Sequence, residues 1–316
     1  MATITDVSRL AKVSKATVSR VLTGSRGVRE ESREAVLKAV ESLNYRPNIF
    51  AQSLAREHSN QVAVLVRDAD ASQLSAYLPQ FTRAIQAMGL ELVLGFASQS
   101  DELSQQLDRF SQLNPVATIV LGACPQQMLG PRTIVIGIGE QAIRYDYTFA
   151  CESALRYLLS QGHRQVAIWL DDDEAQISDE LLTGYRQALQ NQSLPFNREL
   201  VIHGQHGSEH SLLELLNRYL PFSALLVRRD GDAAVAIRLL REFNIAVPGE
   251  VSLMSLEDSP LAVQLSPPLT CIHYPLAELF DAALDKLAQI LHKQTHHENA
   301  LLRGRLVIRQ SVSKFS

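Results

Sequence analysis

Residues 4–24 read ITDVSRLAKVSKATVSRVLTG, and this stretch decides the fold of the N-terminal region. Apolar residues recur at helical spacing on either side of a polar break at 12–14, which predicts two short helices joined by a tight turn. Ser14 can cap the second helix through its hydroxyl group, and Gly24 can end it in the left-handed conformation. The residues predicted to form the shared apolar face are Val7, Leu10, Ala11, Val18 and Val21.

The second of these helices carries small and polar side chains on its opposite face, near its N-terminus. A helix of this kind fits the DNA major groove, where donors reach base-edge acceptors and a methyl group can touch thymine. Lys15, Ala16 and Arg20 are predicted to contact bases. Thr17 and Ser19 are predicted to contact phosphates. Paired helices also occur within protein cores, so the flanking sequence is needed to distinguish a DNA-binding pair of helices from a buried one.

The flanking sequence extends the pair to a three-helix core. Thr3 followed by Asp6 is a capping-box pattern at the start of the first helix. A third helix is predicted over 30–43, which Asn44 can end and which Pro47 prevents from continuing. Its apolar face consists of Val36, Ala39, Val40 and Leu43.

Beyond the three helices, residues 45–48 read YRPN and residues 51–55 read AQSLA. With the paired helices before them, these motifs resemble the LacI/GalR family of bacterial transcription regulators. The resemblance implies a hinge helix that orders in the DNA minor groove beside the same helix of a second subunit. Leu54 would wedge into the central base step, and Tyr45 and Asn48 would contact the DNA backbone. From its residues alone, the segment is a linker or a helix too short to be stable by itself.

Charge is unevenly distributed along the 316 residues. Residues 1–60 hold ten Lys and Arg against six Asp and Glu, a net charge of +4, so the remainder carries −8 of the total of −4. A basic N-terminal region suits a polyanion such as double-stranded DNA, whereas the acidic remainder is repelled by it.

The composition is that of a globular protein, with 46% hydrophobic and 20% charged residues. No apolar run is long enough to span a membrane, and the N-terminus lacks an export signal, so a cytoplasmic location without a membrane partner is expected. Cys124, Cys151 and Cys271 are scattered without ligand spacing. They fit reduced thiols, and neither a metal nor a cofactor is predicted.

From Val62 onwards, strand and helix patterns alternate. Residues 62–66 read VAVLV, a continuous apolar run typical of a strand buried on both faces. The alternation predicts right-handed βαβ units and doubly wound parallel sheets, an α/β body after the all-α head. The predicted helices are 75–88, 101–113, 149–161, 181–191, 208–219 and 233–243. The predicted strands are 62–66, 90–94, 118–121, 133–138, 165–170, 200–203, 224–227, 252–255 and a closing strand within 302–312.

The family resemblance continues through this body. It is carried by GHR at 162–164, by PPLT at 267–270 and by LVIRQSV at 306–312. It implies two lobes like those of periplasmic binding proteins, with an effector in the cleft at the carboxyl ends of the strands. No heptad-bearing tail follows, so a homodimer is expected. The predicted domains are a helix-turn-helix domain at 1–46, a hinge and linker at 47–61 and the two-lobed body at 62–316.

In the family, the cleft binds a sugar, a nucleoside or a phosphorylated metabolite. Carboxylates can pair with sugar hydroxyl groups, and His206 would replace a stacking aromatic residue. For Asp146, Asp230 and Glu257, an equally good interpretation is that each is a solvated carboxylate in a loop. The residues that the resemblance assigns to the effector are Asp146, Thr183, His206, Arg229, Asp230 and Glu257.

Two features of the cleft depart from the family pattern. The arginine that usually clamps the ligand is replaced by Leu181, and Arg228 and Arg229 stand where small residues and asparagine are common. One interpretation is that the guanidinium groups have moved and hold an anionic group such as a sugar phosphate. Another is that they pair with nearby acids at the rim of the cleft. A third is that the response to small molecules has been lost.

Two other classes of function compare poorly with the sequence. A solute-binding protein of similar fold is the alternative, but it would need an export signal and no basic head. An enzyme is not expected, because the chain has no Gly-x-Gly-x-x-Gly motif after a strand, no phosphate-binding loop and no serine elbow. The expected function is a repressor of a carbohydrate-utilisation operon that binds a pseudo-palindromic operator and is controlled by a sugar or phosphosugar.

Overall fold

The computed structural model describes most of the chain and separates it into two compact units. One unit comprises Met1–Asn60 with Leu113–Val116, and the other comprises Gln61–Gln112 with Ala117–Ser316. The predicted roles of Gly24, Asn44 and the hinge fall outside the described residues. The described residues are 3–22, 28–43, 45, 59–67, 71–98, 100–122, 124–139, 141–172, 175–204, 209–218, 221–294 and 300–315.

Three short helices form the N-terminal head. They are α1 (Ile4–Leu10), α2 (Lys15–Leu22) and α3 (Glu30–Ser42). The predicted capping box is present, because the Asp6 N–H donates to Thr3 Oγ1 at 3.3 Å and the Thr3 N–H donates to Asp6 Oδ2 at 2.9 Å. Lys12 adopts a positive φ of 53° in the turn between α1 and α2. The buried core of the head consists of Val7, Val18, Val21, Val36 and Ala39.

One member of the predicted apolar face was wrong. Leu10 is 53% exposed, and it is the last residue of α1. Ala11 and Val13 from the turn pack against the head core in its place.

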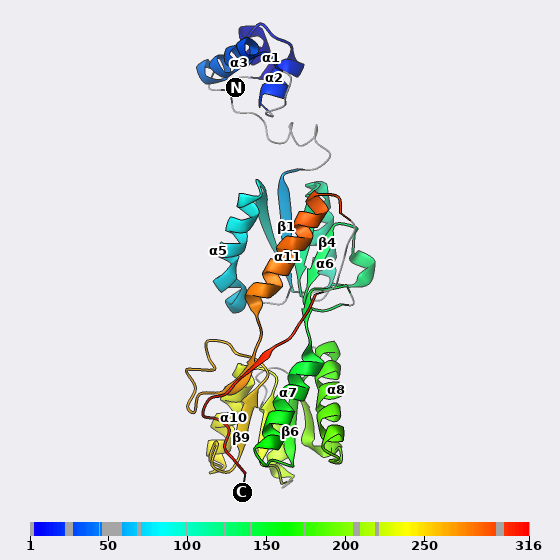
Figure 1. Cartoon of the computed structure of the whole chain (residues 1–316), viewed down its shortest axis with the longest axis vertical. Coiled ribbons are helices and arrows are strands. Elements are labelled where there is room, and N and C mark those ends of the chain that lie inside the picture. Colours follow the sequence, from blue (N-terminus) through cyan, green and yellow to red (C-terminus); the bar gives the residue numbers. More distant parts are fainter. Residues whose placement is uncertain are drawn as a thin grey trace. The chain divides into compact units, whose positions relative to one another are not determined.

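The body begins with a four-stranded parallel sheet of order β2-β1-β3-β4 (Figure 1), which we call the first lobe together with its helices. Its strands are β1 (Gln61–Arg67), β2 (Glu91–Ala97), β3 (Ala117–Leu121) and β4 (Thr133–Ile136). Its helices are α5 (Ala71–Ala87), α6 (Ser100–Gln112), the short 3-10 helix η1 (Gln126–Met128) and α11 (Leu276–Leu291). Each residue of Val62–Val66 is at most 5% exposed, as expected for a strand covered on both faces.

Helix α11 was not predicted. It comes from the C-terminal part of the chain, yet its Phe280 packs on Phe81 of α5, with ring centroids 4.9 Å apart. Its buried residues Leu279, Ala283 and Leu287 recur at helical spacing, so the helix itself was recognisable in the sequence. Its packing on α5 was not, because this contact joins segments far apart in the chain.

The second lobe contains a six-stranded sheet of order β12-β10-β9-β8-β6-β7, in which only β12 among the described strands pairs antiparallel. Its strands are β6 (Val166–Asp171), β7 (Val201–Gly204), β8 (Ala224–Val227), β9 (Ser252–Ser255), β10 (Thr270–His273) and β12 (Arg305–Val307). Its helices are α7 (Tyr147–Ser160), α8 (Ala175–Asn191), η2 (Arg198–Leu200), α9 (His210–Asn217) and α10 (Asp230–Glu242). A separate pair of strands consists of β5 (Arg144–Tyr145) and β11 (Leu301–Leu302).

The predicted closing strand at 302–312 is shorter than expected. After β12 the chain is held by hydrogen bonds of Ser311 instead of a continuous ladder. Its Oγ donates to the Leu253 carbonyl at 2.5 Å and accepts from the Thr270 N–H at 2.8 Å. These side-chain bonds compete with strand geometry and replace part of the ladder.

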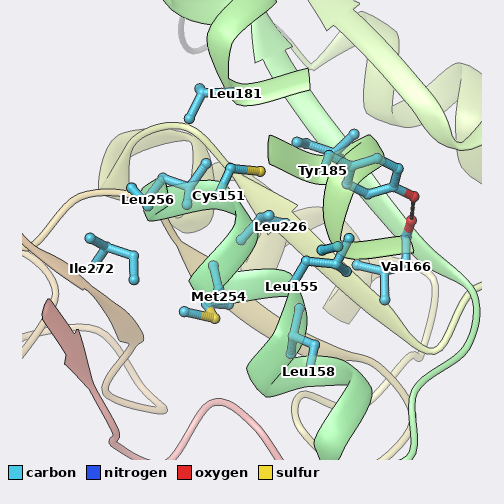
Figure 2. Close-up of a cluster of buried hydrophobic side chains, with 14 of the residues drawn as sticks. Cys151, Leu155, Leu158, Val166, Leu181, Tyr185, Leu226, Met254, Leu256 and Ile272 are labelled. Atoms are coloured by element: carbon cyan, nitrogen blue, oxygen red, sulfur yellow. Dashed lines mark hydrogen bonds between the residues drawn. The ribbon is translucent and has the colours of Figure 1, made fainter. Parts of the chain in front are cut away.

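Helices α7 and α8 pack against each other in the core of the second lobe. A Cβ atom on Gly184 would lie 2.1 Å from the Thr148 carbonyl oxygen, so only glycine permits this approach. The hydroxyl of Tyr185 donates to the Val166 carbonyl at 2.7 Å (Figure 2). The predicted start of α8 was six residues late, because the polar run before Leu181 hides the buried Ile177. Among the described helices, none combines the length and apolar character needed to cross a bilayer.

We expect Gly184→Ala to lower the free energy of unfolding by about 1–3 kcal/mol, because the added methyl group forces α7 and α8 apart. Urea unfolding followed by circular dichroism measures this loss. Gly130→Ala is the matched control, since a Cβ there meets only the Thr133 hydroxyl at 3.4 Å. Equal stability of the two variants would contradict the packing argument.

Candidate functional site

Helix α2 presents the residues that were predicted to contact DNA. Its N-terminus is capped as predicted, because the Thr17 backbone N–H donates to Ser14 Oγ at 3.1 Å. Val18 and Val21 are buried in the head core, and their burial fixes the rotation of the helix. This rotation leaves Lys15, Ala16 and Arg20 exposed and Thr17 and Ser19 partly exposed.

The start of α2 also suits a negatively charged partner. Its first turn contains no acidic residue and begins with Lys15. The positive end of a helix attracts anions, and its first N–H groups can donate to phosphate oxygens. The turn before the helix is held in place by Ser8, whose Oγ donates to the Val13 carbonyl at 2.7 Å. This arrangement can hold cations and donors against a DNA duplex.

The other predicted DNA contacts are less defined. Tyr45 is partly buried, packs against the head core and donates its N–H to the Val40 carbonyl at 2.9 Å. Asn48 and Leu54 lie outside the described residues. The DNA contacts assigned to these three residues therefore stay predictions.

In the body, the structure brings two predicted effector residues together. Asp230 is fully buried at the start of α10, and its N–H donates to Glu257 Oε2 at 3.0 Å. Oδ2 of Asp230 accepts from the Ser259 N–H at 2.7 Å. Burial raises the pKa of Asp230, and hydrogen bonds from Ser255 and Ser259 oppose this rise. Glu257 thus accepts from the start of α10, and Asp230 accepts from the segment after β9, so neither is simply a solvated loop carboxylate.

Asp146 is the N-terminal cap of α7. Its Oδ1 accepts from the Phe149 N–H at 2.9 Å, and its Oδ2 lies 3.6 Å from Nε of Arg303. The carboxylate therefore satisfies the first turn of a helix. This role was not anticipated, because the helix was predicted to begin at 149, whereas it begins at Tyr147, directly after the aspartate.

Thr183 and Leu181 lie on different faces of α8. Thr183 is exposed, and its hydroxyl donates to the Asp179 carbonyl at 2.8 Å. Leu181 is completely buried in the cluster between α7 and the sheet (Figure 2). Next to it, Glu180 binds Arg144, whose Nη1 lies 2.7 Å from both carboxylate oxygens. The clamp position of the family thus holds a core side chain here.

Arg228 and Arg229 follow the carboxyl end of β8. Arg228 is only 9% exposed, and its guanidinium lies 5.4 Å above the ring of Tyr147. Tyr147 belongs to a tyrosine group with Tyr145 and Tyr274, whose ring centroids lie 4.5 Å apart. Burial raises the pKa of both phenols, so they stay protonated donors. This group was not predicted, because Tyr274 is distant in the chain from Tyr145 and Tyr147.

A cavity of about 310 Å³ lies beyond the carboxyl ends of β3 and β4. Three amide side chains line it, those of Gln126, Gln141 and Gln176, together with the half-buried Cys124. Amides both donate and accept, as a ligand rich in hydroxyl groups requires. His206 lies outside the described residues, and within those described no three His, Cys, Asp or Glu side chains are placed to hold a metal ion.

Comparison with known proteins finds matches along the whole chain. Residues 3–48 match the family model for bacterial regulatory proteins, lacI family, and residues 155–312 match the periplasmic binding protein-like domain. The HTH-type transcriptional regulator GalR of Escherichia coli is 31% identical over 330 residues, covering 99% of this chain and 96% of that protein. AscG of the same organism is 27% identical, covering 99% and 98%.

Solved structures share the fold. The lac repressor dimer bound to operator and the anti-inducer ONPF superposes with a TM-score of 0.83 at 23% identity, covering 99% of each chain. The transcriptional regulator CelR in complex with cellobiose gives a TM-score of 0.71 at 25% identity, covering 98% of this chain and 100% of that one.

We expect Asp230→Asn to change the pH dependence of stability. Because burial raises the pKa of Asp230 above the ordinary value of about 3.9, the folded chain binds more protons than the unfolded chain between the two values. The free energy of unfolding of the wild type therefore falls as pH rises through this window, and the variant lacks that fall.

Urea unfolding between about pH 4 and about pH 7 tests this expectation. Asp281→Asn, at an exposed position of α11, is the control and should keep the wild-type slope. Parallel pH curves for wild type and Asp230→Asn would show that Asp230 is not a desolvated acid.

Proposed function

Because this chain is a member of the LacI family of bacterial regulatory proteins, we propose that it represses a carbohydrate-utilisation operon as a homodimer controlled by a sugar or phosphosugar. Membership makes the chain a DNA-binding transcriptional regulator and not an enzyme. The target sequence is a pseudo-palindromic operator, because a two-fold dimer presents two copies of α2 to two half-sites. A regulator of this kind binds chromosomal DNA and therefore acts in the cytoplasm, where the three free thiols would stay reduced.

The observation that carries the DNA-binding proposal is the rotation of α2. Its apolar face is locked in the head core, and its N-terminus is capped by Ser14. The opposite face then offers Lys15 and Arg20, whose donors match the base-edge acceptors of guanine. A solute-binding protein does not require an exposed basic helix face of this kind.

The effector proposal rests on chemistry at the carboxyl ends of the strands. The amide-lined cavity suits the hydroxyl groups of a sugar. Arg228 and Arg229 supply cationic groups after β8 and could hold a phosphate. The relatives support a sugar ligand, since the CelR structure is a complex with cellobiose. An effector that favours one lobe arrangement over another would change operator affinity, because coupling requires a difference in affinity between two states.

We expect Arg20→Ala to weaken operator binding by about 1–3 kcal/mol and to relax base preference within each half-site, because a bidentate base contact is lost. Fluorescence anisotropy at fixed salt with operator and scrambled DNA measures both effects. Arg218→Ala is the matched control, because Arg218 is exposed on the second lobe and pairs only with Glu214 among the described contacts. An unchanged ratio of operator to scrambled affinity in Arg20→Ala would remove this helix from base recognition.

We also expect a sugar or phosphosugar to raise the melting temperature of the protein, because a ligand that binds only the folded state stabilises it by about 2.7 kcal/mol at one hundred times Kd. Differential scanning fluorimetry with free and phosphorylated sugars tests this expectation. A larger shift with phosphosugars, lost in the double variant Arg228→Gln/Arg229→Gln and kept in Arg218→Gln, assigns the phosphate to these arginines. An unchanged melting temperature with every sugar would overturn the effector proposal and leave the DNA-binding proposal unaffected.

A further inference from the structure

A second pocket lies on the second lobe, outside both the α2 surface and the carboxyl ends of the strands. It has a volume of about 470 Å³ and is formed by α7 and the β12 segment. Its lining includes Phe149, Ser153, Arg156, Tyr157, Arg305 and Leu306.

One part of the pocket is apolar. Phe149, Tyr157 and Leu306 are each partly buried and face the same hollow. The guanidinium of Arg303 lies 4.5 Å above the Phe149 ring and covers it on one side. A planar ring or a short aliphatic group can pack against such a surface and remove apolar area from water.

The other part of the pocket is cationic. Arg156 and Arg305 are both exposed, and within the described residues neither pairs with a carboxylate. By contrast, Arg144 pairs with Glu180, and Arg309 pairs with Asp258. Both guanidinium groups line the same pocket, in a body whose net charge is −8. They present planar donor groups that match phosphate or carboxylate oxygens.

The pocket also touches the tyrosine group behind it. Gly304 lines it, and a Cβ atom there would lie 2.5 Å from Ile272 Cγ2 and 3.1 Å from the ring of Tyr274. The chain before β12 therefore packs against Tyr274. The ring of Tyr274 contacts Tyr147, and the guanidinium of Arg228 lies over the Tyr147 ring. A molecule in the pocket would contact α7, the helix that also carries Tyr147 at its first position.

We propose that this pocket binds a small organic anion that combines an apolar ring or chain with a phosphate or carboxylate group. The apolar part packs on Phe149 and Leu306, and the anionic group bridges Arg156 and Arg305. The site is separate from the effector position of the proposed function and does not depend on it.

Isothermal titration calorimetry of the full chain without DNA tests the proposal. The probes are phenyl phosphate, benzoate, inorganic phosphate and phenol, which separate the two anionic groups from each other and from the ring. The variants are Arg156→Gln and Arg305→Gln. Arg186→Gln is the matched control, because Arg186 also lies over a phenylalanine ring, 4.7 Å from that of Phe196, on a different helix.

We expect at least one of the two aryl anions to bind more tightly than inorganic phosphate or phenol. Each pocket variant should weaken that binding about ten-fold or more, whereas Arg186→Gln should leave it unchanged. Ser153→Leu provides a second test without touching a charge, since it fills the pocket and should abolish binding. The proposal is overturned if neither aryl anion binds, or if binding survives in the two arginine variants and in Ser153→Leu.

Discussion

The first N–H groups of every helix need acceptors, and meeting this need organises much of the structure. Ser14 supplies the acceptor for α2, Asp146 for α7 and Glu257 for α10. In the head, the cap sets where the DNA-facing helix begins. In the body, the same requirement engages two carboxylates that the family resemblance assigned to the effector. A ligand there would have to share these acids with the backbone, so specificity must come in part from other groups.

The sequence predicted the elements that depend on local periodicity. The three head helices, the central buried strand and most of the alternation appear close to their expected positions. Helix α11 was missed although Leu279, Ala283 and Leu287 recur at helical spacing, and only its packing on Phe81 depends on a distant partner. Strand β10 was missed because distant partners such as Ser311 place it. The prediction that Leu10 belongs to the buried apolar face was wrong, because helical spacing does not show where a short helix ends. The hinge residues Asn48 and Leu54 lie outside the described residues, so their DNA contacts stay predictions.

The candidate effector site was predictable in location but not in its chemistry. Parallel strands place their carboxyl ends together, and Asp146, Asp230 and Glu257 do follow strand ends or begin helices, whereas Thr183 lies within α8. Their hydrogen-bond partners could not be inferred, because Glu257 and Asp230 are joined only by folding. Leu181 illustrates the reverse case. Its departure from the family pattern was visible in the sequence, and the buried position explains how a leucine can occupy it without exposing apolar surface.

The position of α11 has a consequence for synthesis of the protein. The strands of the first lobe are complete at Ile136, but the helix that packs on them begins only at Leu276. A nascent chain must therefore leave the part of the sheet that α11 covers exposed while strands β6 to β10 of the second lobe emerge from the ribosome. Exposed sheet faces promote aggregation in partly folded chains. The first lobe is thus completed only after most of the second lobe has been made, although its strands are translated early. A chain truncated before α11 would keep an aggregation-prone, incomplete first lobe.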